Sequence, residues 1–154
     1  VFERLGDFNH GGTFSHQPVT AAAGVAAFDW LVEHGLVARA ETIGRTLGEK
    51  LHAAFDYHLH VGDVRGQGLM WGIELVADRG TRQPFPVEAK LASRVTDEAL
   101  TRGLIVYAMS GCADGWAGDH VMVAPPLIVQ VDELDEIIAR LASALEAALS
   151  VAQQ

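Results

Sequence analysis

Residues 61–76 read VGDVRGQGLMWGIELV, and apolar residues alternate with small or polar residues through the second half of this stretch. The alternating apolar positions are Leu69, Trp71, Ile73 and Leu75. A period of two is typical of a β-strand with one buried face. A shorter strand over 61–65 precedes it across Gly66-Gln67-Gly68, so the stretch predicts a hairpin or a bulged bend.

The sequence on both sides of this hairpin supplies helices and two further strands. Helix-start and helix-stop residues, together with apolar spacing, predict helices over 18–33, 37–57 and 87–102 and a last helix with its N-cap at Asp132. Short apolar runs predict strands over 104–109 and 120–124. From residue 61 onward the order is ββ-α-β-β-α, which predicts an α+β fold with helices on one face of a small sheet. The part before residue 61 is purely helical and offers no sheet of its own.

Composition narrows the class of protein. The chain has 154 residues and a formal net charge of −9, so neither nucleic acid nor an anionic membrane is an expected partner. The single cysteine, Cys112, excludes an internal disulfide and favours a reducing, cytoplasmic setting. Because no base or cation adjoins Cys112 in the sequence, we expect an unreactive loop thiol.

Three short segments are candidates for chemistry. Residues 8–16, FNHGGTFSH, either grip an anion through backbone N–H groups and hydroxyls or form a glycine-rich turn that caps the next helix. Arg65 either binds a carboxylate or pairs on the surface with Asp63. His58 and His60 have no nearby carboxylate or cysteine cluster, so two solvated histidines are expected in place of a metal site.

Taken together, three segments resemble one enzyme family in order and spacing. They are FNHGGTFSHQPVTAAAG at 8–24, VGDVRGQGLMWGIELVADRGTRQPF at 61–85 and DHVMVAPPLIVQVDELDEII at 119–138. They resemble the C-terminal part of the class III aminotransferases, which are pyridoxal-phosphate enzymes of fold type I and include the omega-amino-acid transaminases. The resemblance covers essentially the whole chain. It implies the small C-terminal domain of that fold, preceded by helices of the large domain and a connector.

The resemblance also implies roles for individual residues. The family threonine of the HG-x-T loop donates to the phosphate of pyridoxal 5'-phosphate, usually across a homodimer interface, and here it is Thr13 with Gly12 beside it. The family arginine of the V-R-G-x-G-L segment often binds the substrate carboxylate, and here it is Arg65. The substrates implied are an amine or amino acid and a keto acid. The FSHQP segment departs from a common S-G-H-P form of the loop.

One departure from the family is larger. The reaction needs a lysine that carries the cofactor, and neither Lys50 nor Lys90 lies in the family's lysine context. We therefore expect that the chain is the C-terminal part of a longer enzyme and is inactive alone. The expected divisions are 1–35 (end of the large domain), 36–60 (connector helix) and 61–154 (small domain). Two alternatives stay open: a non-catalytic ligand-sensing or dimerisation module, and an aminomutase or decarboxylase of the same superfamily.

Overall fold

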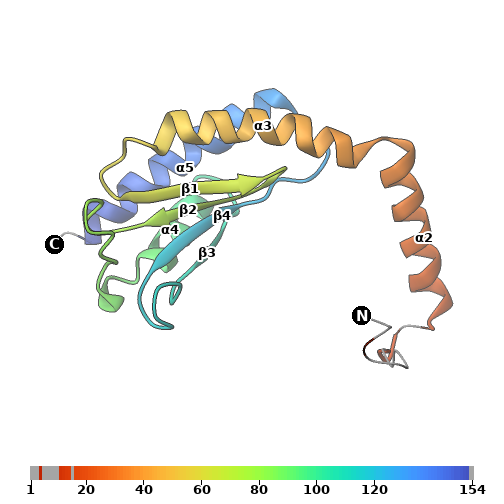
Figure 1. Ribbon diagram of the computed structural model, residues 1–154, viewed down its shortest axis with the longest axis horizontal. Helices are drawn as coiled ribbons and strands as arrows, with labels where there is room; N and C mark the ends of the chain where they lie inside the picture. The colour runs from red at the N-terminus through yellow and green to blue at the C-terminus, as the bar shows by residue number, and fades with distance from the viewer. Residues whose placement is uncertain (1–3, 5–10, 15, 153–154) are drawn as a thin grey trace. The chain divides into compact units, whose positions relative to one another are not determined.

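The computed structural model describes Arg4, residues 11–14 and residues 16–152, without the side chains of residues 151 and 152. The chain divides into two compact units, Val1–Leu36 and Val37–Gln154, and its elements are labelled in Figure 1. The assignment of these segments to a large domain, a connector and a small domain stays a prediction.

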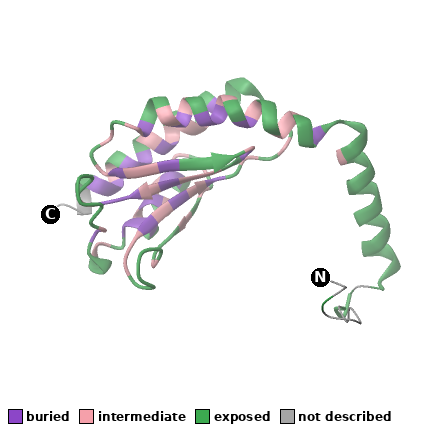
Figure 2. Cartoon of the chain, viewed as in Figure 1, coloured by how far each residue is buried: buried purple, intermediate pink, exposed green. Residues whose placement is uncertain are grey.

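The first unit contains the helix α2, Pro18–Glu33. Pro18 occupies the first turn, where its missing N–H costs no hydrogen bond. Gly35 follows with a φ of +58°, a conformation that favours glycine at a helix end. The predicted bounds of 18–33 are confirmed. No residue of α2 is buried within this unit (Figure 2), although the helix carries Val25, Phe28 and Trp30.

No single described helix is both long enough and apolar enough to cross a membrane. The helix α2 and the next helix, α3 (Leu36–Phe55), meet that test only as a pair, by length and composition.

The second unit is built on an antiparallel four-stranded sheet of order β1-β2-β4-β3. Its strands are β1 Val61–Gln67, β2 Met70–Leu75, β3 Tyr107–Met109 and β4 Asp119–Val123. Its helical segments are α3 Leu36–Phe55, the 3₁₀ turn η1 Val87–Ala89, α4 Leu91–Thr101 and α5 Val131–Ala152. The α+β class expected from the sequence is therefore confirmed.

The sequence predicts either a hairpin or a bulged bend at β1 and β2, and the structure shows a hairpin that also contains a bulge. Gln67 pairs with Met70, so a two-residue loop joins the strands, and its first residue, Gly68, has a φ of +56°. Glycine is the residue preferred where a short hairpin loop needs positive φ. A bulge between Val61 and Asp63 shifts the register at the other end of β1.

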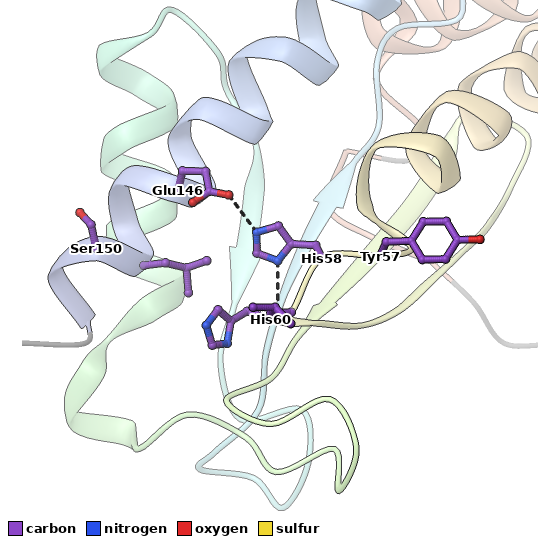
Figure 3. Close-up of a pocket in the computed structure, with 7 residues that line it drawn as sticks. Tyr57, His58, His60, Glu146 and Ser150 are labelled. Carbon is purple, nitrogen blue, oxygen red and sulfur yellow. Dashed lines mark hydrogen bonds and ion pairs between the residues drawn. The ribbon is translucent and has the colours of Figure 1, made fainter.

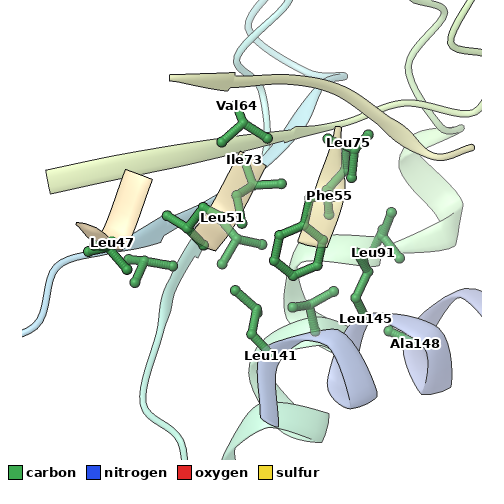
Figure 4. Close-up of a cluster of buried hydrophobic side chains, with 14 of the residues drawn as sticks. Leu47, Leu51, Phe55, Val64, Ile73, Leu75, Leu91, Leu141, Leu145 and Ala148 are labelled. Carbon is green, nitrogen blue, oxygen red and sulfur yellow. The ribbon is translucent and has the colours of Figure 1, made fainter. Parts of the chain in front are cut away.

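One face of the sheet packs against α3, α4 and α5 (Figure 4). The largest fully buried side chains include Leu47, Leu51 and Phe55 from α3, Leu91 and Val95 from α4, Leu134 and Leu141 from α5, and Ile73, Leu75 and Val121 from the sheet. Each such side chain contributes about 1.5–3 kcal/mol by leaving water. The helices therefore cover a single sheet face, as the sequence predicts.

Several element boundaries differ from the sequence prediction. The expected helix over 87–102 is interrupted at Lys90, whose φ is +49°, and α4 begins at Leu91 because the carboxylate of Asp119 on β4 accepts the N–H of Ala92 at 3.3 Å. The strand expected from residue 104 begins at Tyr107. The helix α5 begins at Val131, one residue before the expected N-cap Asp132, and Glu133 accepts the N–H of Gln130 at 2.7 Å.

The helix α3 approaches the hairpin so closely that two of its positions require glycine. A Cβ at Gly44 would lie 2.1 Å from the carbonyl oxygen of Gly68, and a Cβ at Gly48 would lie 2.2 Å from Cζ2 of Trp71. Since Gly44 and Gly48 are four residues apart, they lie on the same helix face. This contact fixes the hairpin against the helix.

Replacing Gly44 by Ala therefore destabilises the second unit, although alanine favours helix. We expect the free energy of unfolding to fall by about 1–3 kcal/mol, since the added methyl displaces backbone. Urea denaturation followed by far-UV circular dichroism measures the change. Gly72→Ala is the matched control, because its Cβ would meet only the carbonyl oxygen of Arg65 at 3.8 Å. Equal stability of the two variants would contradict the close approach.

Candidate functional site

The face of the sheet turned away from the helices carries the sequence-predicted arginine. Arg65 pairs with Gly72, Gly72 with Met122, and Met122 with Tyr107. Directly opposed residues project to the same side of a sheet, so these four form one row across all the strands. We call this side, which also carries Glu74 and His120, the open face. Arg65 lies on the open face, so its guanidinium is accessible, and 64% of its side chain is exposed.

Two carboxylates hold the guanidinium of Arg65. Its Nη1 donates to Asp63 at 2.9 Å and to Glu74 at 3.4 Å. The hydrogen bond that Arg65 donates to Asp63 is the main reason why the pKa of Arg65 is raised. Both ion pairs are solvent-exposed, so each is worth about 0–1 kcal/mol. Both also use the same nitrogen, which leaves Nε and Nη2 outside the two pairs.

Arg65 borders a hollow of about 220 Å³ on the open face. The hollow is lined by Arg65, Met70, Trp71, Gly72, His120 and Met122. Arg65 thus pairs with Asp63 on the surface and also borders an open hollow. Its predicted role in binding a substrate carboxylate stays a prediction.

Glu74 was not among the sequence-predicted site residues. Alternation along β2 places it on the same face as Gly72. Its contact with Arg65 follows only from the register of β1 against β2, where Asp63 is paired with Glu74 beyond the bulge. The alternation along β2 was therefore enough to predict the sheet face on which Glu74 lies. That Glu74 contacts Arg65 could be seen only in the structure.

The sequence shows no base beside Cys112, whereas the structure places one next to its thiol. Its Sγ lies 3.0 Å from Nδ1 of His120, which β4 projects onto the open face. The loop that carries Cys112 is held by Ser110, whose hydroxyl donates to the buried Asp119 at 2.6 Å. It is also ordered by Asp114, whose carboxylate accepts the N–H groups of Ala117 and Trp116, and these bonds lower the pKa of Asp114. Cys112 and His120 are eight positions apart in the sequence, so no local motif predicted that they would be in contact.

The phosphate-loop candidates Gly12 and Thr13 lie in the first unit, ahead of α2. Both are exposed. Gln17 donates its N–H to the carbonyl of Phe14 at 3.2 Å, and the hydroxyl of Thr20 donates to the carbonyl of Gln17 at 3.0 Å. Residues 8–10 and Ser15, which belong to the same motif, lie outside the described residues. The predicted phosphate contact of Gly12 and Thr13 stays a prediction.

His58 and His60 lie in a different place, between α3 and β1 (Figure 3). His58 Nε2 contacts Glu146 at 3.2 Å, and its Nδ1 accepts the N–H of His60 at 3.1 Å. Only 17% of the His58 side chain is exposed, so the expectation of two solvated histidines is wrong for His58. These residues border a cavity of about 450 Å³. Within the part of the chain that the structure describes, no three His, Cys, Asp or Glu residues are placed to hold a metal ion.

The two lysines lie outside the lining of the hollow at Arg65. Lys50 on α3 forms an ion pair with Asp135 on α5, within the helical layer. Lys90 lies at the junction of η1 and α4. Neither lysine lines the hollow.

The Cys112–His120 contact makes the thiol reactivity testable. An imidazole within hydrogen-bond reach of a thiol acts as a general base when the sulfur attacks an electrophile. We expect His120→Gln to slow alkylation of Cys112 by iodoacetamide at neutral pH on the order of threefold or more. Mass spectrometry follows the reaction, and Cys112 is the only cysteine. His52→Gln is the control, because the imidazole of His52 on α3 contacts Asp56 and not Cys112. Equal rates in both variants would show that the imidazole does not act on the thiol.

Comparison with known proteins reveals one family over nearly the whole chain. The profile of the family described as aminotransferase class-III matches residues 1–145. The chain is 40% identical over 147 residues to an uncharacterised aminotransferase of Schizosaccharomyces pombe, covering 94% of this chain and 32% of that protein. It therefore spans about a third of the length of this curated relative.

Solved structures give the same result. An (S)-enantioselective omega-transaminase from Thermomicrobium roseum is 33% identical with a TM-score of 0.79, over 93% of this chain and 30% of that one. An amine transaminase from an uncultivated Pseudomonas species, solved in a form with bound pyridoxal phosphate, is 32% identical with a TM-score of 0.77. That match covers 96% of this chain and 31% of the other.

Proposed function

Because this chain belongs to the class-III aminotransferase family, we propose that it supplies the phosphate-binding turn and the substrate-facing small domain of an aminotransferase. The enzyme moves an amino group between an amine or amino acid and a keto acid. The strongest support is the position of Arg65, which borders a hollow on the open face and does not pack into the core.

Arg65 binds the carboxylate of the acceptor in this proposal. A guanidinium presents five N–H donors in a planar fork that matches a carboxylate. Asp63 and Glu74 both engage Nη1, so they hold the guanidinium in place and leave Nε and Nη2 outside the two ion pairs. Because the two ion pairs are exposed, the carboxylate of a substrate competes with them at small cost.

Gly12 and Thr13 fit a phosphate group chemically. An exposed glycine lets backbone N–H groups approach an anion, and a threonine hydroxyl adds one donor ahead of a helix start. Pyridoxal phosphate is the cofactor of the family and, when bound, acts as an electron sink for the amino group's carbon. In this proposal the chain anchors the phosphate through Thr13, across the interface of a homodimer.

Lys50 and Lys90 do not fit the role of the cofactor-bearing lysine. Lys50 is engaged by Asp135 on the helical side of the sheet, and Lys90 lies at a helix junction. The lysine of the reaction is therefore supplied, in this proposal, by polypeptide outside these 154 residues, and the chain alone is inactive. The apolar side chains that α2 exposes agree with further polypeptide packing there, because a helix that is apolar on several sides is usually buried.

The role of Arg65 predicts a selective kinetic defect in the full-length enzyme. Arg65→Gln removes a charged hydrogen-bond donor, so we expect KM for a keto-acid acceptor to rise about 10–100-fold. Steady-state kinetics measure it, and KM for an amine donor without a carboxylate stays unchanged. Arg45→Gln is the control, since Arg45 is an exposed α3 residue paired with Glu41 at 3.8 Å. An unchanged acceptor KM in Arg65→Gln would contradict the assignment.

The role of Thr13 predicts weaker retention of the cofactor. Thr13→Val keeps the shape and removes the hydroxyl, so we expect the Kd of pyridoxal phosphate in the full-length enzyme to rise about tenfold or more. Equilibrium dialysis with absorbance detection gives this value without an activity assay. Thr20→Val is the matched control, because its hydroxyl is bound to the backbone of Gln17. If both variants retain the cofactor as the wild type does, Thr13 does not anchor the phosphate.

A further inference from the structure

We propose that the hollow over Gly72 binds the apolar body of a substrate whose carboxylate is held by Arg65, and that Gly72 sets how bulky this body can be. The inference deepens the proposed function and rests on its assignment of Arg65. The substrate class is an amino acid or keto acid with an aromatic or branched side chain.

The row across the sheet places Gly72 between a cation and an apolar wall. Arg65 is its neighbour on β1, and Met122 is its neighbour on β4. Adjacent strands lie about 4.8 Å apart, so about 10 Å separates the two flanking strands. Since glycine has no side chain, nothing at position 72 projects into this interval. A molecule anchored at Arg65 can therefore lie over Gly72 and reach Met122.

The fold itself does not require glycine at position 72. A Cβ there would meet only the carbonyl oxygen of Arg65, at the ordinary contact distance of 3.8 Å, and Gly72 is not among the glycines with positive φ. By contrast, a Cβ at Gly66 would lie 2.4 Å from the carbonyl oxygen of Met70. Glycine weakens a strand interior and often marks a place where a ligand approaches the backbone. The approach of a ligand to the backbone accounts for glycine at position 72, whereas close packing against Met70 accounts for Gly66.

The side chains around the hollow define what it accepts. Arg65 is the cationic end, whereas Met70 and Met122 supply flexible thioethers. Methionine adapts to irregular apolar shapes and makes favourable contacts with aromatic rings. The chain has three methionines, and Met109, the third, lies on the same face opposite His120 in the next row.

The next row of the sheet limits the direction in which an apolar body lies. Glu74 is paired with His120 there, and Asp63 is paired with Glu74. The Asp63 and Glu74 end of this row disfavours a hydrophobic group, because desolvating charged side chains is costly. The apolar body therefore extends toward Met122 and toward Tyr107, an exposed residue.

The test is a graded series at one position in the full-length enzyme: Gly72→Ala, Gly72→Val and Gly72→Leu. We measure kcat/KM for 2-oxo-4-phenylbutyrate and for pyruvate as acceptors. The ratio of the two is expected to fall with side-chain size and to drop at least tenfold in Gly72→Leu, since one methylene in a pocket discriminates by about 10–200-fold. Calorimetry with 4-phenylbutyrate and propionate gives the same comparison as binding constants. Met109→Leu, outside the hollow, keeps the ratio within about twofold.

The outcomes separate this inference from the assignment of Arg65. A constant ratio throughout the series, with the thermal transition unchanged, overturns the subsite at Gly72. If the ratio stays constant but Arg65→Gln raises KM for both acceptors, only the subsite at Gly72 is overturned and the role of Arg65 stands. If Arg65→Gln changes neither KM, the carboxylate assignment fails as well. A falling ratio in Gly72→Leu with an unchanged thermal transition supports the subsite, because a purely structural role would not discriminate between acceptors.

Discussion

The pairing of β1 with β2 fixes which side chains of the hairpin meet the helices and which remain on the open face. Side chains alternate along a strand, so a slip by one residue would exchange the two sets. The slip is opposed at the loop end of the hairpin. The short loop at Gly68 sets the register, and α3 touches this loop so closely that Gly44 has no room for a Cβ. Ile73 and Leu75 gain burial only in this register.

The same register determines the chemistry of the open face. It brings Arg65 beside Glu74 and leaves Gly72 between the guanidinium and Met122. One face of the sheet thus packs into the core, and the open face carries polar and thioether side chains around the hollow. A site on rigid strands holds its side chains more precisely than a loop does. The Arg65 cluster depends on backbone pairing, since exposed ion pairs alone are weak.

Local patterns were sufficient for the elements but not for long-range contacts. The period of two in residues 69–75 identified the second strand, and Pro18 and Gly35 marked the bounds of α2. The break at Lys90 was missed because the Asp119 carboxylate that binds the N–H of Ala92 comes from a strand 27 residues away in sequence. The same reason applies to the site. Arg65 is found from its motif, whereas its contact with Glu74 and the approach of His120 to Cys112 depend on strand register.

The most direct measurement is the set of backbone nuclear Overhauser effects across β1, β2 and β4. Contacts that define directly opposed residues identify the register without any assumption about activity. The structure predicts that they join Arg65 to Gly72 and Gly72 to Met122. If they instead join Arg65 to Trp71 or Ile73 as its opposed residue, the guanidinium turns toward the helices. Both the carboxylate site and the hollow over Gly72 would then be contradicted.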